Sequence, residues 1–208
     1  MIDRLCSRQE AAYYSIAYNM ALVLNIVIAS VHGAVQPWFF AHIRNGNISE
    51  LRRKSTKLIG GVSALCILAM LLSPAALWIL APGSYGDALR VMPVICMASL
   101  FYGEYMLFSN VAASSEKPVY MSIATVIGAV ANVGLNLLLI PKYGYVAAGY
   151  TTLFCYMLFA GMPYVFSGMI WRRQNGRERV FEGWKLLLIS AGSFLVMLLY
   201  SLVQGFVG

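Results

Sequence analysis

Glu104 is the residue whose chemistry fits its surroundings least. It is the only acidic residue well inside an apolar run of the sequence. An ionised carboxylate costs about 2.5 kcal/mol or more in hydrocarbon, so Glu104 must be protonated, paired or in contact with water. Helical spacing puts it on the face of Phe101 and Phe108 and away from Asn110. The sequence therefore predicts that its polar partner comes from another helix.

Glu104 and Arg90 each have a functional and a structural interpretation. In a functional role, Glu104 binds a proton or cation, or contacts a hydroxyl group of a ligand. In a structural role, it makes a hydrogen bond between helices. Arg90 lies close to Pro93 at the start of an apolar segment. It either meets an anionic ligand or extends its charge to the lipid interface.

Polar side chains recur at spacings of four and seven along residues 11–40. They are Tyr14, Tyr18, Asn25, His32 and Gln36. Residues at these spacings share one face of a helix. Such a stripe indicates either the wall of a hydrated cavity or a row of interhelical hydrogen bonds. A single histidine such as His32 is typical of a neutral hydrogen-bonding group rather than a metal ligand.

A second stripe follows residues 119–140. Its members are Ser122, Thr125, Gly128, Asn132 and Asn136. Small residues allow two helix backbones to approach closely, and asparagines join helices by hydrogen bonds. The pattern favours a structural role for this stripe, with Asn132 and Asn136 holding neighbouring helices together.

No pattern of a catalytic or metal site occurs in the sequence. The glycine-rich phosphate loop, the nucleophile elbow and paired metal ligands are all missing. Cys6, Cys66, Cys96 and Cys155 lie far apart, so no zinc motif or disulfide framework is visible. The sequence predicts no enzyme, no metal site and no cofactor, and it leaves coupling to a proton or a sodium ion open.

The composition places the chain in a membrane. Of its 208 residues, 60% are hydrophobic and only 11% are charged, with a mean hydropathy of +0.72. Soluble domains have about 45–50% apolar and about 25% charged residues. The net charge of +7 does not indicate a nucleic-acid partner, because the basic residues lie beside apolar segments. The lipid bilayer is the predicted surrounding.

Six apolar segments can be separated by polar or turn-forming residues. They span residues 11–40, 58–81, 91–113, 119–140, 145–171 and 184–206. Their continuous apolar character excludes the alternation that membrane strands need. The predicted fold class is therefore an all-α integral membrane protein with a six-helix transmembrane bundle.

Basic residues predict the orientation of these helices. Arginine and lysine are concentrated in the loops 41–57 and 172–183, whereas the loops after 81 and 140 carry only Arg90 and Lys142. Short loops rich in arginine and lysine stay on the cytoplasmic side. Four helices separate the two basic loops, which returns the chain to the same side. Both loops are then cytoplasmic, and both termini lie outside.

The termini favour a part of a longer protein. An exported N-terminus with Arg4 and Arg8 and no signal peptide is typical of a fragment. We therefore expect residues 1–10 to end a preceding helix or an outer loop. Residues 11–171 then form five helices, residues 172–183 a basic loop, and residues 184–208 an additional helix.

Several sequence runs resemble the polysaccharide-flippase family of the multidrug/oligosaccharidyl-lipid/polysaccharide exporter superfamily. The runs are Asn132-Val133-Gly134-Leu135-Asn136 through Pro141-Lys142-Tyr143-Gly144, then Ala147-Ala148-Gly149-Tyr150-Thr151-Thr152-Leu153, and earlier Asp3-Arg4, Ala12-Tyr13-Tyr14-Ser15-Ile16-Ala17-Tyr18 and Gln36-Pro37. They follow the order of the family's second half and cover most of residues 3–168. The chain departs from the family at Ala147-Ala148-Gly149, where glycine-alanine-alanine is usual, and it lacks the first lobe.

The resemblance implies a fold, a function and partners. The fold is the C-terminal lobe of a bundle of twelve to fourteen helices, which alternates its access between the two faces of the bacterial cytoplasmic (inner) membrane. The function is the flipping of undecaprenyl-diphosphate-linked oligosaccharide units for cell-surface polysaccharide assembly. Implied partners are a separate N-terminal lobe and a polysaccharide polymerase or glycosyltransferases. Because one lobe holds only part of the path, we expect the chain alone to be inactive.

Two other functions stay open at this point. One is a small-molecule or cation antiporter of the same superfamily, which differs in cargo. The other is a non-transporting membrane partner or the remnant of a larger protein. Candidate residues for a substrate path are Tyr18, Asn25, His32, Gln36, Arg90, Glu104, Asn132 and Asn136.

Overall fold

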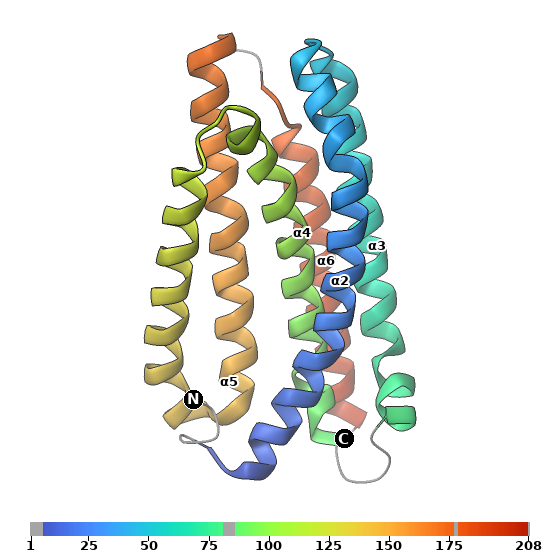
Figure 1. Ribbon diagram of the computed structural model, residues 1–208. Coiled ribbons are helices and arrows are strands. Elements are labelled where there is room, and N and C mark those ends of the chain that lie inside the picture. The colour runs from blue at the N-terminus through green and yellow to red at the C-terminus, as the bar shows by residue number, and fades with distance from the viewer. Residues whose placement is uncertain (1–5, 81–85, 177–178, 208) are drawn as a thin grey trace.

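The chain folds into helices that run roughly parallel to one long axis (Figure 1). The computed structural model describes residues 6–80, 86–176 and 179–207. Its elements are α2 (Arg8–Arg44), α3 (Ile48–Leu80), the short 3-10 helix η1 (Gly86–Arg90), α4 (Met92–Ser114), α5 (Val119–Asn175) and α6 (Gly183–Val207). No strand occurs in these ranges, which confirms the all-α prediction. Asp3 and Arg4, which contribute to the family resemblance, lie outside the described residues, as does Arg177 of the predicted basic loop 172–183.

Five of these helices are long and apolar enough to cross a membrane, which is compatible with a multi-pass membrane protein. The predicted number of six membrane-spanning helices is therefore wrong. The two segments 119–140 and 145–171 belong to one element, α5, because the backbone is helical at Pro141 and Tyr143 and leaves helical geometry only at Gly144.

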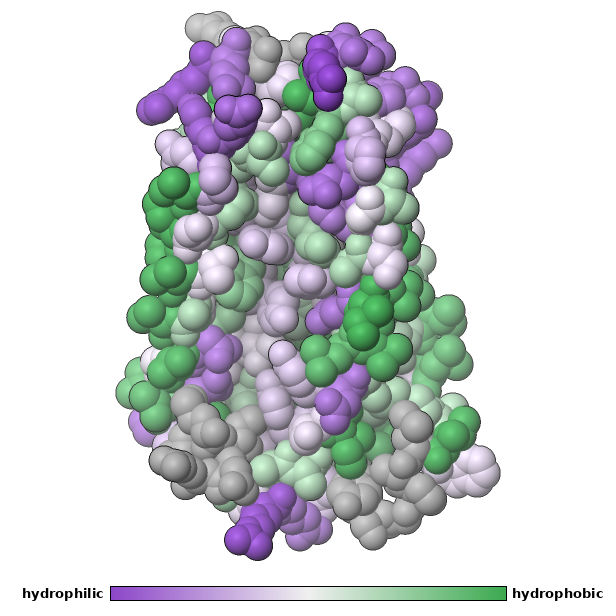
Figure 2. Space-filling model, in the orientation of Figure 1, coloured by the Kyte–Doolittle hydropathy of each residue, from purple (hydrophilic) through white to green (hydrophobic). Residues whose placement is uncertain are grey.

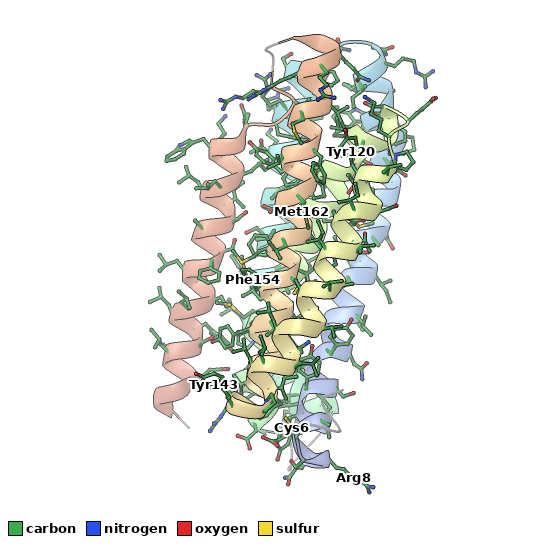
Figure 3. All side chains as sticks on the ribbon, turned by 90° about the vertical axis from the view of Figure 1, so that its left-hand side faces the viewer. Cys6, Arg8, Tyr120, Tyr143, Phe154 and Met162 are labelled. Carbon is green, nitrogen blue, oxygen red and sulfur yellow. The ribbon has the colours of Figure 1, made fainter. Side chains whose placement is uncertain are left out.

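Gly144 divides α5 into a first limb (119–143) and a second limb (145–175). Its φ of 67° and ψ of −160° are strained for any residue with a Cβ. The chain reverses there, and the limbs lie side by side (Figure 1). Figure 3 places Tyr120 and Tyr143 toward opposite ends of the first limb, with Phe154 and Met162 on the second. The predicted turn before residue 145 is thus a tight reversal within a helical hairpin.

Helix α4 is the centre of the bundle. In its most apolar stretch 78% of residues are buried, compared with 17% to 33% in the other four helices. It packs against α2, α3, α5 and α6. The outer helices expose large apolar side chains, such as Val23, Leu72, Val130 and Leu202. Their outer faces suit lipid, whereas α4 is surrounded by protein.

The basic segments lie together at one end of the bundle, where Figure 2 shows hydrophilic residues gathered. Arg52 of α3 donates a hydrogen bond to the carbonyl of Arg179, and Thr56 donates one to Glu182 at 3.2 Å. The predicted loop 41–57 is mostly helix, since α2 ends at Arg44 and α3 begins at Ile48. Helix also occupies the start of the predicted loop 172–183. Basic residues are good helix formers, so the helices continue beyond the apolar segments.

Candidate functional site

The polar stripe of α2 faces the central helix α4. Gln36 Nε2 donates to Asn110 Oδ1 at 3.2 Å. His32 lies close to the Asn110 side chain and to the backbone of Met106. Asn110 is only 1% exposed, and it was not among the residues predicted for a substrate path. Two parts of the chain 74 residues apart thereby form one amide and imidazole cluster.

This cluster keeps unused hydrogen-bonding capacity. Asn25 Oδ1, His32 Nε2 and Asn110 Nδ2 are buried and have no hydrogen-bond partner among the described residues. Buried polar atoms without partners are rare and destabilising. Together they offer both acceptors and a donor within helices that are otherwise apolar. Such an arrangement is suited to a polar ligand or to water inside a membrane protein.

Tyrosines extend the cluster toward α5. Tyr14 and Tyr18 stack with ring centroids 5.9 Å apart, and Tyr102 meets Tyr156 edge-on at 6.1 Å. Tyr156 lies close enough to Tyr14 and Tyr18 to interact with both electrostatically. Tyr14 also shares a hydrogen bond of 3.0 Å with Thr152. The tyrosines of three helices therefore form one aromatic wall with phenolic hydroxyl groups.

We use the name polar face for these residues of α2, α4 and α5. They are Tyr14, Tyr18, Asn25, His32, Gln36, Tyr102, Asn110 and Tyr156. A pale band of weakly hydrophilic residues runs along the molecule between α2 and the first limb of α5 (Figure 2). Tyr14 and Gln36 of the predicted stripe bond to other helices, as the interhelical interpretation requires, and the hydrated cavity stays a prediction.

Asn132 and Asn136 lie apart from the polar face, at the contact of the two α5 limbs. Asn136 Nδ2 donates to Asn132 Oδ1 at 2.9 Å, and Thr151 donates to Asn136 Oδ1. The Asn132 side chain also lies close to Cys155 on the second limb. The bond from Thr151 crosses from one limb to the other, whereas the bond between Asn136 and Asn132 lies within the first limb. The geometry is that of the structural role expected from the asparagine and small-residue pattern.

Glu104 points to the other side of α4. Ser190 of α6 donates a hydrogen bond of 2.5 Å to Glu104 Oε1, and Glu104 is 5% exposed. The expected partner from another helix is thereby found. No described cation lies within ion-pair distance of this carboxyl. Glu104 lines an apolar pocket of about 710 Å³ together with Phe101 and Phe108, as their shared helical face predicted.

Arg90 is separate from all of these groups. It ends η1, is exposed, and pairs with Asp87 through Nε at 3.3 Å. An exposed ion pair of this kind contributes little to stability. The structure therefore places Gln36 and His32 beside Asn110 and Tyr18 among the tyrosines, with Asn25 between them on α2, and it leaves Arg90, Glu104, Asn132 and Asn136 outside these contacts.

Sequence reasoning missed Tyr102, Asn110 and Tyr156. Each lies in an apolar run where a single tyrosine or asparagine has no distinctive spacing. Only the packing of α4 against α2 and α5 brings them to the polar face. As for metals, no cluster of three or more potential ligands occurs within residues 6–80, 86–176 and 179–207.

Comparison with known proteins gives no match: no model of a protein family, no curated protein and no solved structure matches this chain.

Proposed function

We propose that this chain forms one wall of a transmembrane path that translocates undecaprenyl-diphosphate-linked oligosaccharide units. The observation that carries the proposal is the polar face, with the unpartnered atoms of Asn25, His32 and Asn110 on the helices that also carry Tyr14, Tyr18 and Tyr102. Sugar hydroxyls both donate and accept hydrogen bonds, and the apolar faces of sugar rings pack on aromatic rings. The polar face offers partners for both properties.

The position of the polar face supports a path shared with a second lobe. Tyr18, Asn25 and His32 are half-buried, so part of each side chain remains accessible at the edge of the bundle. The resemblance to polysaccharide flippases implies such a second lobe, and the buried central helix α4 supports the polar face from behind. Polar residues inside membrane segments of transporters face such shared cavities.

Photo-crosslinking tests the assignment of the polar face. A polyprenyl-diphosphate oligosaccharide with a photoreactive sugar is added to the chain in proteoliposomes, and labelled peptides are identified by mass spectrometry. We expect labels on α2, α4 and α5 that unlabelled compound suppresses. Asn25→Leu should reduce labelling, and Asn19→Leu, which changes an exposed amide on the same helix, should not. Equal labelling of the lipid-facing surface and the polar face contradicts the proposal.

A translocation assay tests the cargo. Fluorescent lipid-linked oligosaccharide is placed in proteoliposomes that contain the chain and an N-terminal flippase lobe, and access of a membrane-impermeant quencher is followed. We expect faster exchange with both lobes than with either alone. Transport of a small cationic dye that lipid-linked sugar does not inhibit would assign the protein to the antiporter class instead.

A further inference from the structure

The apolar pocket beside Glu104 is a trough between the second limb of α5 and α6. Both helices pack on α4, whereas few backbone contacts join them to each other within the described residues. Phe101, Ala160 and Leu186 are buried at the floor, and Met157, Trp184 and Leu187 are exposed at the rim. The lining on α6 extends from Gly183 to Phe194, which is about three helical turns. The trough thus opens sideways toward lipid.

A second pocket of about 310 Å³ lies at the basic end and shares Tyr164 and Arg179 with the trough. We call it the basic pocket. Arg172 also lines it, and no described acidic side chain forms an ion pair with Arg172 or Arg179. Trp171 lines it as well. The Trp171 indole Nε1 is buried without a hydrogen-bond partner among the described residues, in a side chain that is 5% exposed.

The segment that carries Arg179 is anchored on both sides. Arg52 donates a hydrogen bond to its carbonyl. Phe181, two residues later, packs on Phe108 of α4 and on Phe39 of α2, with ring centroids 5.0 and 6.3 Å apart respectively. Contacts with α2, α3 and α4 therefore hold its backbone where Arg179 lines both pockets.

We propose that the two pockets form one binding site for an anionic glycerophospholipid of the membrane. The basic pocket takes the phosphate group, with Arg172 and Arg179 as cationic partners and the Trp171 indole as a neutral donor. The trough takes one acyl chain. Guanidinium groups bind phosphate oxygens in a charge-assisted and often bidentate manner. Basic clusters at the cytoplasmic end of helices attract anionic headgroups.

The shape of the site favours a lipid over a free anion. An inorganic phosphate would fill the basic pocket and leave the apolar trough without an occupant. A lipid covers both, and its acyl chain enters through the exposed rim without crossing polar surface. Glu104, the only carboxyl among the described lining residues, already has Ser190 as its partner in the trough wall. This site lies on the side of α4 away from the polar face, so it does not depend on the proposed function.

Native mass spectrometry of the detergent-purified chain tests the site. The protein is titrated with phosphatidylglycerol, with phosphatidylcholine of the same acyl chains, and with inorganic phosphate. We expect one phosphatidylglycerol to bind at least about tenfold more tightly than phosphatidylcholine, as one charge-assisted contact implies. Inorganic phosphate should not displace it. Equal affinity for the two lipids, or displacement by free phosphate, overturns the proposal.

Matched variants separate the site from general surface charge. Arg172→Gln and Arg179→Gln should each lower phosphatidylglycerol affinity, whereas Arg173→Gln, an exposed residue outside both pockets, should not. In the trough, a Cβ at Gly161 meets nothing within 4 Å, so Gly161→Leu fills the space of the acyl chain without a backbone clash. It should therefore lower phosphatidylglycerol affinity.

The glycine control lies outside the trough. Gly192→Leu is equally unhindered on α6 and should leave binding unchanged. Thermal unfolding shows whether each variant is folded. If the arginine and glycine test variants bind like their controls, the lipid lies elsewhere and the proposal is wrong.

Discussion

Ser190 on α6 donates a hydrogen bond to the Glu104 carboxyl on α4, across 86 positions of the sequence. The same hydroxyl lies 3.0 Å from the carbonyl of Leu186 in its own helix. The bond joins the last described helix to the central one at the only acidic side chain that is buried among the described residues. It therefore connects a residue of functional interest directly to the packing of the bundle.

Substitutions at this pair separate transport from stability. Glu104→Gln keeps an oxygen that accepts from Ser190 but cannot gain or lose a proton. In a full-length two-lobe protein we expect lower transport with unchanged expression. Ser190→Ala leaves a buried carboxyl without its donor, so the free energy of unfolding should fall by about 1–3 kcal/mol. Proteoliposome transport and detergent unfolding curves measure the two effects. Equal transport by Glu104→Gln would make this carboxyl structural.

Gly149 and Gly134 of α5 should respond oppositely to alanine. A Cβ at Gly149 lies 2.7 Å from Val91 Cγ1, and Val91 is a stiff, completely buried β-branched residue. Gly149→Ala should therefore lower the free energy of unfolding by about 1–3 kcal/mol. A Cβ at Gly134 meets nothing within 4 Å, so Gly134→Ala should not destabilise the helix. Equal unfolding midpoints for the two variants would contradict the close contact of α5 with Val91.

Asn136 is expected to hold the α5 hairpin together. Asn136→Leu removes its hydrogen bonds with Asn132 and Thr151 at once. Only the bond with Thr151 joins the two limbs, and interhelical bonds contribute about 1–2 kcal/mol in membrane proteins. Thr125→Val is the control, because its hydroxyl bonds only to Met121 in its own limb. Unfolding in detergent should show a larger loss for Asn136→Leu than for Thr125→Val, and the reverse order would exclude the hairpin role.

Glu182 should make the basic end sensitive to acid. A hydrogen bond from Lys185, with a further one from Thr56, holds the pKa of the Glu182 carboxyl below its ordinary value. A lowered pKa stabilises the folded state above the unfolded value, and this contribution is lost as pH falls through the folded value. The melting temperature of the wild type should thus fall more than that of Glu182→Gln between about pH 5 and pH 3. Parallel pH profiles would show that Glu182 contributes nothing.

The hydropathy of the sequence was sufficient to predict much of the fold. Continuous apolar runs located the helices, and the run Pro141 to Gly144 marked the reversal of α5. The helix count failed there, because Gly144 alone leaves helical geometry and no separate loop forms. The predicted basic loops were too long, because hydropathy detects where a segment leaves lipid and not where its backbone stops being helical.

The candidate site was predictable only where one helix carries it. The α2 stripe followed from spacing within a single segment, and the face shared by Glu104, Phe101 and Phe108 followed from helical geometry. The roles of Ser190 and Asn110 could not be predicted from spacing, because they depend on which helices become neighbours in space. A single sequence records periodicity along each helix, whereas the choice of neighbour is decided by packing between helices.

The hairpin at Gly144 also bears on the order in which the bundle assembles. Its limbs meet through residues close in sequence: Thr151 bonds to Asn136, 15 positions away. Contacts of short sequence separation form fastest. Helix α6 instead depends on distant partners, through Ser193 with Ser63, 130 positions apart, and Ser190 with Glu104. We therefore expect α5 to enter the membrane as a preformed pair and α6 to close the bundle last.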